Sequence, residues 1–242
     1  MSVDNSGLIG VGIYTVPEAS RLTGVASARI KRWIVGYEFK TGAGESHHSS
    51  PVWHADLEPI DGSLALSFRD LVEVRFIDSF LSAGVSWKEL RSAAARAEEL
   101  LNNPHPFSTY QFKTDGRRIF ADIGEHLNQE KMLELTRNQY VFRQVIAPSL
   151  FEGYEYEAGE LLRWRPKAGH KMIVLDPLRA FGQPITDVGS VPTSIILRAV
   201  KAEEDEAEVR VARMYDIPVQ VVRAAVAFES NFPSPNQIKS AA

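Results

Sequence analysis

The sequence predicts a mainly helical α+β fold, with several small units and a tail. Apolar residues recur at helical spacing through most of the first hundred residues and again near the C-terminus. The region between them carries short alternating segments that are typical of strands. Helix-capping sequences, glycines and prolines separate the segments. We expect a winged helix-turn-helix with a helical extension, a small α+β unit, a three-helix unit and a tail, at residues 1–104, 105–175, 176–229 and 230–242.

Length, charge and composition narrow the class of protein. The chain has 242 residues and a net charge of −4, so any surface that binds nucleic acid must be local. It has no cysteine, which excludes disulfides, thiolate metal sites and cysteine nucleophiles. No apolar run approaches the roughly 20 residues that span a membrane, and the N-terminus lacks a charged segment followed by an apolar one. We expect a soluble, cytoplasmic protein without a cofactor.

The most informative segment runs from Tyr14 to Ile34 and reads as two short helices joined by a tight turn. Thr15 is placed to cap the first helix, and Glu18 completes a capping box three residues later. Gly24 lies in the bend, where a helix end commonly requires a positive φ. These features predict a helix-turn-helix. The alternative is a small helical hairpin used for packing or for protein contacts.

The second helix of this pair is basic on its exposed side. From Arg21 to Lys40 the sequence contains five basic residues and one acid, Glu38. A basic helix can lie in the major groove of DNA, where arginine and lysine side chains meet phosphates and guanine edges. The residues that we expect to contact DNA are Thr15, Thr23, Ser27, Arg29, Lys31, Arg32 and Lys40.

The Tyr14-Thr15 opening and the Thr23-Gly24-Val25 turn resemble the N-terminal helix-turn-helix of the MerR family. The resemblance implies that a hairpin wing follows the second helix and lies against the DNA backbone. Residues 36–65, rich in glycine and proline, stand at that place. The same segment has a second interpretation, as a metal cluster or simply a solvated loop, because it contains His47, His48 and His54 near Glu45 and Asp56.

Two more helices are predicted after the wing. Ser67 with Asp70 forms another capping box, and apolar residues then cover more than half of the helix surface, so this helix should be buried. Gly84 ends it, and Ser86 opens a helix whose apolar face runs from Leu90 to Leu101.

These helices extend the MerR resemblance to about residues 14–102. The run Asn102-Asn103-Pro104-His105-Pro106 then ends the last helix, where MerR dimers usually continue into a long coiled coil. MerR-style dimerisation and promoter untwisting are therefore not expected.

The middle of the chain changes to alternating patterns. Asp115-Gly116 is a strong hairpin signal, and the segments at 110–113 and 117–120 are predicted as its two strands. A helix is predicted over residues 138–150. Three more strands are predicted at about 152–157, 160–165 and 171–175.

The C-terminal part contains three proline-bearing pieces, Asp176-Pro177, Phe181-Gly182-Gln183-Pro184-Ile185 and Val191-Pro192-Thr193. With the helical segments after them, they resemble the small three-helix module of VapB-type antitoxins, over about residues 174–229. We expect Asp205 with Glu208 to cap the second helix and Pro218 to open the third.

The surface of this module is acidic. From Lys201 to Asp216 there are six acids and three bases, a balance of −3. Acidic charge repels phosphate, so dimerisation or toxin docking explains this surface at least as well as DNA binding does. A second DNA contact, if present, would use Gln220 and Arg223 of the third helix.

A homodimer is expected, since one recognition helix covers too few base pairs to be specific alone. The predicted contact lies within residues 190–229. Val219, Val221 and Phe228 should exceed what a three-helix unit needs for its own core.

The two resemblances together imply an antitoxin of a type II toxin-antitoxin system. Such a protein would bind operator DNA as an autorepressor and neutralise a PIN-type ribonuclease toxin. The alternative is a free-standing MerR-like regulator that binds a small effector in an apolar cavity within residues 105–175. The sequence has no nucleophile elbow, phosphate loop, paired-carboxylate signature or HExxH motif, so we do not expect an enzyme.

Overall fold

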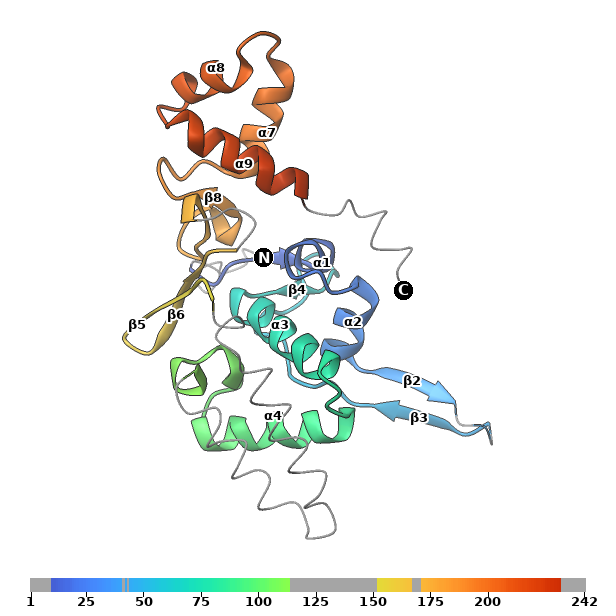
Figure 1. Cartoon of the computed structure of the whole chain (residues 1–242). Coiled ribbons are helices and arrows are strands. Elements are labelled where there is room, and N and C mark those ends of the chain that lie inside the picture. Colours follow the sequence, from blue (N-terminus) through green and yellow to red (C-terminus); the bar gives the residue numbers. More distant parts are fainter. Residues whose placement is uncertain (1–9, 41, 43, 114–151, 167–170, 232–242) are drawn as a thin grey trace, which may run out of the picture. The chain divides into compact units, whose positions relative to one another are not determined.

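The computed structural model describes residues 10–40, 42, 44–113, 152–166 and 171–231 (Figure 1). The chain divides into two compact units. The N-terminal unit comprises Thr15–Glu152 and Ala158–Leu161, and the C-terminal unit comprises Met1–Tyr14, Gly153–Glu157 and Leu162–Ala242. Helices predominate and the sheets are small, which confirms the α+β class. The finer division into four parts stays a prediction.

The N-terminal unit consists of helices with a two-stranded hairpin between the second and third of them (Figure 1). The boundary between the two units falls within the short strand β1 (Tyr14–Thr15). The elements after it are, in order, α1 (Val16–Thr23), α2 (Ser27–Val35), β2 (Tyr37–Lys40), β3 (Ser46–Ser49), β4 (Ala65–Leu66), α3 (Phe68–Ser82), α4 (Trp87–Leu101) and the 3₁₀ turn η2 (Pro106–Ser108).

Helix α3 is the centre of this unit, as its apolar surface predicts. The capping box of Ser67 and Asp70 is present at its start, and most of its residues are buried. A cluster of four phenylalanines surrounds its second half, with ring centres 5.0 to 6.4 Å apart: Phe76, Phe80, Phe107 and Phe112. Each such pair adds about 0.5–1.5 kcal/mol to the stabilisation from burial.

The prediction of a strand at residues 110–113 is wrong, because these residues are helical. The hydroxyl oxygen of Thr109 accepts a hydrogen bond from the Phe112 backbone N–H at 3.0 Å, as a helix-capping residue does. The helical turn also places Phe112 against Phe107, fully buried. Tertiary packing and a local cap therefore override the strand pattern of residues 110–113. The strand predicted at 117–120 and the helix predicted at 138–150 lie outside the described residues.

The C-terminal unit contains a four-stranded sheet in sequential order and three helices. Strand β7 pairs antiparallel with both of its neighbours. The first three strands confirm the strands predicted near 152–157, 160–165 and 171–175. In order, the elements are β5 (Tyr154–Glu157), β6 (Glu160–Trp164), β7 (Ile173–Leu175), the 3₁₀ turn η5 (Ala180–Gly182), β8 (Pro184–Thr186), α7 (Thr193–Ala202), α8 (Ala207–Met214) and α9 (Val219–Asn231).

Two expectations for the three helices are corrected. No side chain caps α8, where Glu206 is in the left-handed conformation instead of the predicted cap by Asp205. Val221 and Phe228 are not surplus to the core, because they are 5% and 0% exposed within this chain. They are used by the packing of α9 in its own unit, so they are not free for a dimer contact. Among the described residues, no helix is long and apolar enough to cross a lipid bilayer.

Candidate nucleic-acid interface

The first helix of the predicted DNA-binding segment is capped as its sequence implies. Thr15 Oγ1 accepts a hydrogen bond from the Glu18 N–H at 3.3 Å, and the Thr15 N–H donates to Glu18 Oε2 at 2.8 Å. Gly24 ends the helix with φ 78° and ψ 2°, which confirms the left-handed turn. The left-handed residue Gly24 therefore turns the chain from the end of α1 toward the start of α2 at Ser27.

The two threonines predicted to contact DNA have structural roles at the two ends of α1. The Thr15 hydroxyl donates to Glu18 within the capping box at 2.7 Å. Thr23 Oγ1 donates to the Ala19 carbonyl at 2.7 Å and accepts from the Val25 N–H at 3.2 Å. The Thr15 hydroxyl therefore fixes the start of α1, and the Thr23 hydroxyl fixes the turn after it.

The start of α2 differs from the start of α1. Ala26 is its N-cap and supplies no side-chain hydrogen bond, and Ser27 is the first helical residue. The first N–H groups of α2, at the positive end of the helix dipole, are thus not covered by a capping side chain. Such a helix start is suited to a phosphate oxygen.

Helix α2 separates its buried and basic sides clearly. Ile30, Trp33 and Ile34 are buried, whereas Lys31 and Arg32 are exposed. This confirms the predicted orientation of the helix. The exposed side holds the two cations that are best placed to meet a polyanion.

Arg29 is also exposed, but it is bound to its own protein. Its Nη1 lies 2.9 Å from Asp78 Oδ1 of α3, and its Cζ lies 5.0 Å from the centre of the Trp33 ring. The Asp78 contact links α2 to α3. Arg29 would have to give up this contact to bind a phosphate.

The hairpin β2–β3 follows α2 after a single residue, Gly36. That residue has φ 80° and ψ −176°, a combination that only glycine adopts readily. A Cβ atom at this position would lie 2.4 Å from the Ser49 carbonyl oxygen. The Val52 N–H donates to the Trp33 carbonyl at 2.7 Å, which attaches the end of the hairpin to α2. The hairpin therefore leaves α2 in a defined direction.

One face of the hairpin carries a continuous strip of rings. The Arg32 guanidinium lies 5.6 Å from the centre of Tyr37, Tyr37 is 5.8 Å from Phe39, and Phe39 is 5.7 Å from His47. Because side chains alternate along a strand, Lys40 lies on the opposite face. The strip thus joins α2 to the hairpin, whereas Lys40 is separated from it.

Arg91 of α4 holds the base of the hairpin. Its Nη2 donates to Ser49 Oγ at 2.6 Å and to the Ser50 carbonyl at 2.7 Å. Its Cζ lies 5.9 Å from the Trp87 ring, and Trp87 is 5.9 Å from Trp33 in an edge-to-face arrangement. Arg91 therefore connects α4 to the end of the hairpin, and Trp87 of the same helix connects it to α2.

A buried polar network lies beside the start of α3. His105 Nε2 is 2.6 Å from Asp56 Oδ1, and the Trp53 indole N–H donates to Asp70 Oδ1 at 2.7 Å. The Glu73 carboxyl oxygen Oε1 accepts a hydrogen bond from the Ser108 N–H at 2.9 Å. Burial raises the pKa of Glu73 to about 8. Burial also lowers the pKa of His105, but the Asp56 hydrogen bond and nearby carboxylates outweigh it, so the net pKa is raised.

The candidate metal cluster near the wing is not assembled. His47 and His48 occupy adjacent positions of β3, so their side chains point to opposite faces. Within the part of the chain that the structure describes, no group of three or more histidine and acidic side chains could hold a metal ion.

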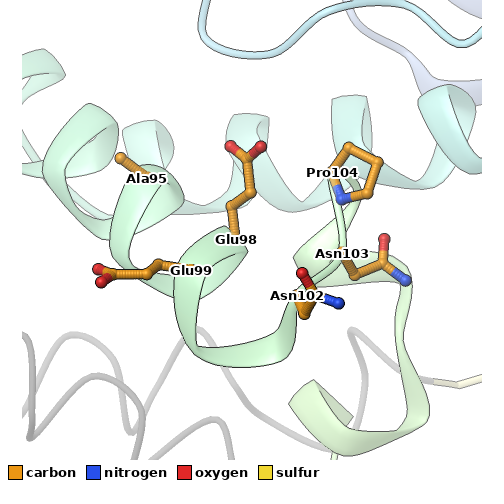
Figure 2. A pocket seen from close by; sticks show the side chains of 6 residues that line it. All are labelled: Ala95, Glu98, Glu99, Asn102, Asn103 and Pro104. Atoms are coloured by element: carbon orange, nitrogen blue, oxygen red, sulfur yellow. The ribbon is translucent and has the colours of Figure 1, made fainter.

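A hollow of about 310 Å³ lies at the end of α4 (Figure 2). Its lining includes two acids and two asparagines, in the set Ala95, Glu98, Glu99, Asn102, Asn103 and Pro104. It lies outside residues 105–175 and differs in character from the apolar cavity that a small-effector regulator would need. Most of that range lies beyond the described residues.

The two residues considered for a second DNA contact are both exposed on α9. Arg223 Nε lies 2.6 Å from Glu208 Oε2 of α8, so its charge is partly offset. Gln220 stands one turn earlier. The pair offers a weak electrostatic attraction to DNA.

Comparison with known proteins supports the antitoxin resemblance. A Mycobacterium tuberculosis protein named "Putative antitoxin VapB45" is 26% identical over 204 residues, covering 79% of this chain and 84% of its own length. The crystal structure of Rv2018 from Mycobacterium tuberculosis matches with a TM-score of 0.69 and 23% identity, over 90% of this chain and 99% of that one. No family model matches the chain. The structural likeness shows a shared fold.

Sequence reasoning missed three residues of this region. Tyr37 and Phe39 could have been recognised, because two aromatic residues alternate with charged ones in a short exposed strand. Arg91 gave no usable signal, because it lies 42 positions from Ser49 along the sequence.

Proposed function

We propose that this protein is an antitoxin of a type II toxin-antitoxin system that represses its own operon and neutralises a PIN-type ribonuclease. The antitoxin role rests on the similarity to the VapB45 protein over most of both chains. The toxin class rests on the VapB-type resemblance of the C-terminal sequence. Helices α1 and α2 with the β2–β3 hairpin act as a MerR-like winged helix-turn-helix on operator DNA.

The observation that carries the DNA-binding proposal is the exposed, basic side of α2. Lys31 and Arg32 project from a helix whose start is free of a capping side chain, directly before a hairpin. Cations, free N–H groups and a protruding hairpin are the parts that a recognition helix and wing use on a duplex. The position of α2 is fixed by two contacts with other helices, Arg29 with Asp78 and Trp33 with Trp87.

Repression by this protein would differ from MerR activation. MerR dimers depend on a long helix after the fourth helix of the unit, and α4 ends here at Leu101, followed by Asn102 with φ 47°. We therefore propose that a dimer represses by occupying the promoter. Since Val221 and Phe228 are buried, the exposed Ile195 and Met214 are the better candidates for a contact within residues 190–229.

Two binding measurements on the full chain test this function. The product of the neighbouring gene, co-expressed with a tag, should capture this protein, and its ribonuclease activity should fall in the complex. The purified protein should shift the DNA upstream of its own gene and leave a scrambled duplex of equal length unshifted. If the product of the neighbouring gene does not capture this protein, the antitoxin role is contradicted. If the protein binds both duplexes equally, the repressor role is contradicted.

A further inference from the structure

The turn η5 contains three consecutive residues in the left-handed conformation. The φ values are 47° for Ala180, 54° for Phe181 and 80° for Gly182. Glycine adopts such angles freely, but alanine and phenylalanine do so only at a cost in free energy. A run of this kind persists where the surrounding structure enforces it, and it commonly marks a functional position.

The N-terminal segment enforces the turn from one side. The Ile13 N–H donates to the Phe181 carbonyl at 3.0 Å, and the Tyr14 hydroxyl donates to the Gly182 carbonyl at 2.6 Å. A Cβ atom on Gly182 would lie 2.4 Å from the Tyr14 oxygen, so the approach is possible only for glycine. Two adjacent carbonyls of the turn are therefore held.

The residues just before the turn hold it from the other side. Arg179 Nε lies 2.8 Å from Asp176 Oδ2, and Arg179 Nη1 donates to Ser190 Oγ at 3.0 Å. The other Asp176 oxygen accepts from the Leu178 N–H at 3.0 Å. The turn is thus rigid in the free protein.

The result of this rigidity is that an aromatic side chain points into solvent. Phe181 is 65% exposed and Leu178 is 67% exposed, the two highest values among the large apolar side chains of the described residues. The Phe181 ring gains little from burial in its own unit, and its backbone is strained. Folding alone would favour glycine at this position.

We propose that Phe181, together with Leu178 three residues earlier, is the anchor that binds an apolar pocket of the toxin, an inference that rests on the proposed antitoxin function. Large aromatic side chains dominate the energetics of protein interfaces. Fixing the backbone that carries the ring before binding removes the entropy cost of ordering that segment. The strain in the free chain is then the cost of a preorganised contact.

The chemistry of the turn favours a protein pocket over DNA or a second copy. The neighbouring Arg179 is already held by Asp176 and Ser190, so it offers little to phosphate. Two exposed side chains present an apolar area on the order of 200 Å², so a symmetric contact made only by two copies of this turn would bury far less than the roughly 800 Å² per partner of a stable interface. A small, rigid, protruding anchor suits insertion into a concave site on a different protein.

The substitution Phe181→Gly separates binding from folding. It removes the ring and also relieves the left-handed strain, so the free protein should unfold at the same or a higher temperature. Capture by the co-expressed product of the neighbouring gene should weaken roughly thirtyfold, the loss expected for an interface hot spot. Ala158→Gly is the matched control, since Ala158 has φ 50° and is exposed, and this change should leave capture unaltered.

Each possible result of the capture and unfolding measurements either supports or overturns the anchor role of Phe181. Wild-type-like capture of Phe181→Gly overturns the anchor while the antitoxin role stands. Weak capture together with a lower unfolding temperature also overturns it, because Phe181 would then be a folding residue. A change in the self-association of the free chain without a change in capture assigns the surface to a second copy. Absence of capture by the wild type overturns the proposed function and the anchor with it.

Discussion

Replacing Lys31 and Arg32 together by alanine should weaken operator binding and flatten its dependence on salt. Both side chains are exposed on α2, and the buried residues of that helix are untouched. Each phosphate contact contributes about −0.9 to the slope of log K against log salt. Loss of two contacts should therefore reduce the magnitude of the slope by about 1.8. Between 50 and 200 mM salt, the wild type should then lose roughly tenfold more affinity than the variant.

The assay is fluorescence anisotropy with labelled upstream DNA at four or more salt concentrations, on the full chain. Lys201→Ala with Arg213→Ala is the matched control, because it removes the same charge from exposed positions of the C-terminal unit. Arg29→Ala should change the slope less and lower the unfolding temperature slightly, since it loses the Asp78 and Trp33 contacts. An unchanged slope in the Lys31/Arg32 variant, with wild-type affinity, would refute the placement of α2 on DNA.

Three further predictions concern the support of this surface. Gly36→Ala should destabilise the N-terminal unit by about 1–3 kcal/mol in thermal unfolding, whereas Gly42→Ala, which meets no atom within 4 Å, should be nearly silent; equal effects would disprove the strain argument. Arg91→Ala should raise the operator Kd with an unchanged salt slope and faster amide exchange in the hairpin, and a flattened slope would mean that Arg91 itself contacts phosphate. The Glu73 carboxyl has its pKa raised to about 8 by burial, so the folded state binds the extra proton and wild-type stability should fall as pH rises from about 4.5 to about 8. The variant Glu73→Gln cannot lose this proton, so its free energy of unfolding in urea, relative to that of the wild type, should rise by up to about 1.4 kcal/mol per pH unit. If the unfolding free energies of the two proteins changed equally with pH, the buried, protonated carboxyl would be contradicted.

Local signals predicted the start of the fold well. The capping boxes at Thr15 and Ser67, the left-handed Gly24 and the buried face of α3 depend on residues within one or two turns of each other. Such interactions can be derived from spacing alone. The β5, β6 and β7 strands were likewise found from alternation and turn residues.

The errors came from contacts between distant residues. The 110–113 segment is helical because Phe112 packs into a phenylalanine cluster that spacing could not reveal. Phe228 was assigned to a dimer surface because the amount of core that α7 and α8 provide was unknown from sequence. Arg29 was grouped with the free cations because its partner, Asp78, lies on another helix. The basic side of α2 was predictable, but which of its cations are free was not.

The measurement that tests the central claim most directly is a competition titration of the full chain on the DNA upstream of its own gene. At about 150 mM salt, specific binding should exceed binding to a scrambled duplex by at least about 10³-fold, and added toxin should remain in the complex. Equal affinity for the two duplexes would contradict an operator-binding antitoxin built on α2 and the β2–β3 hairpin.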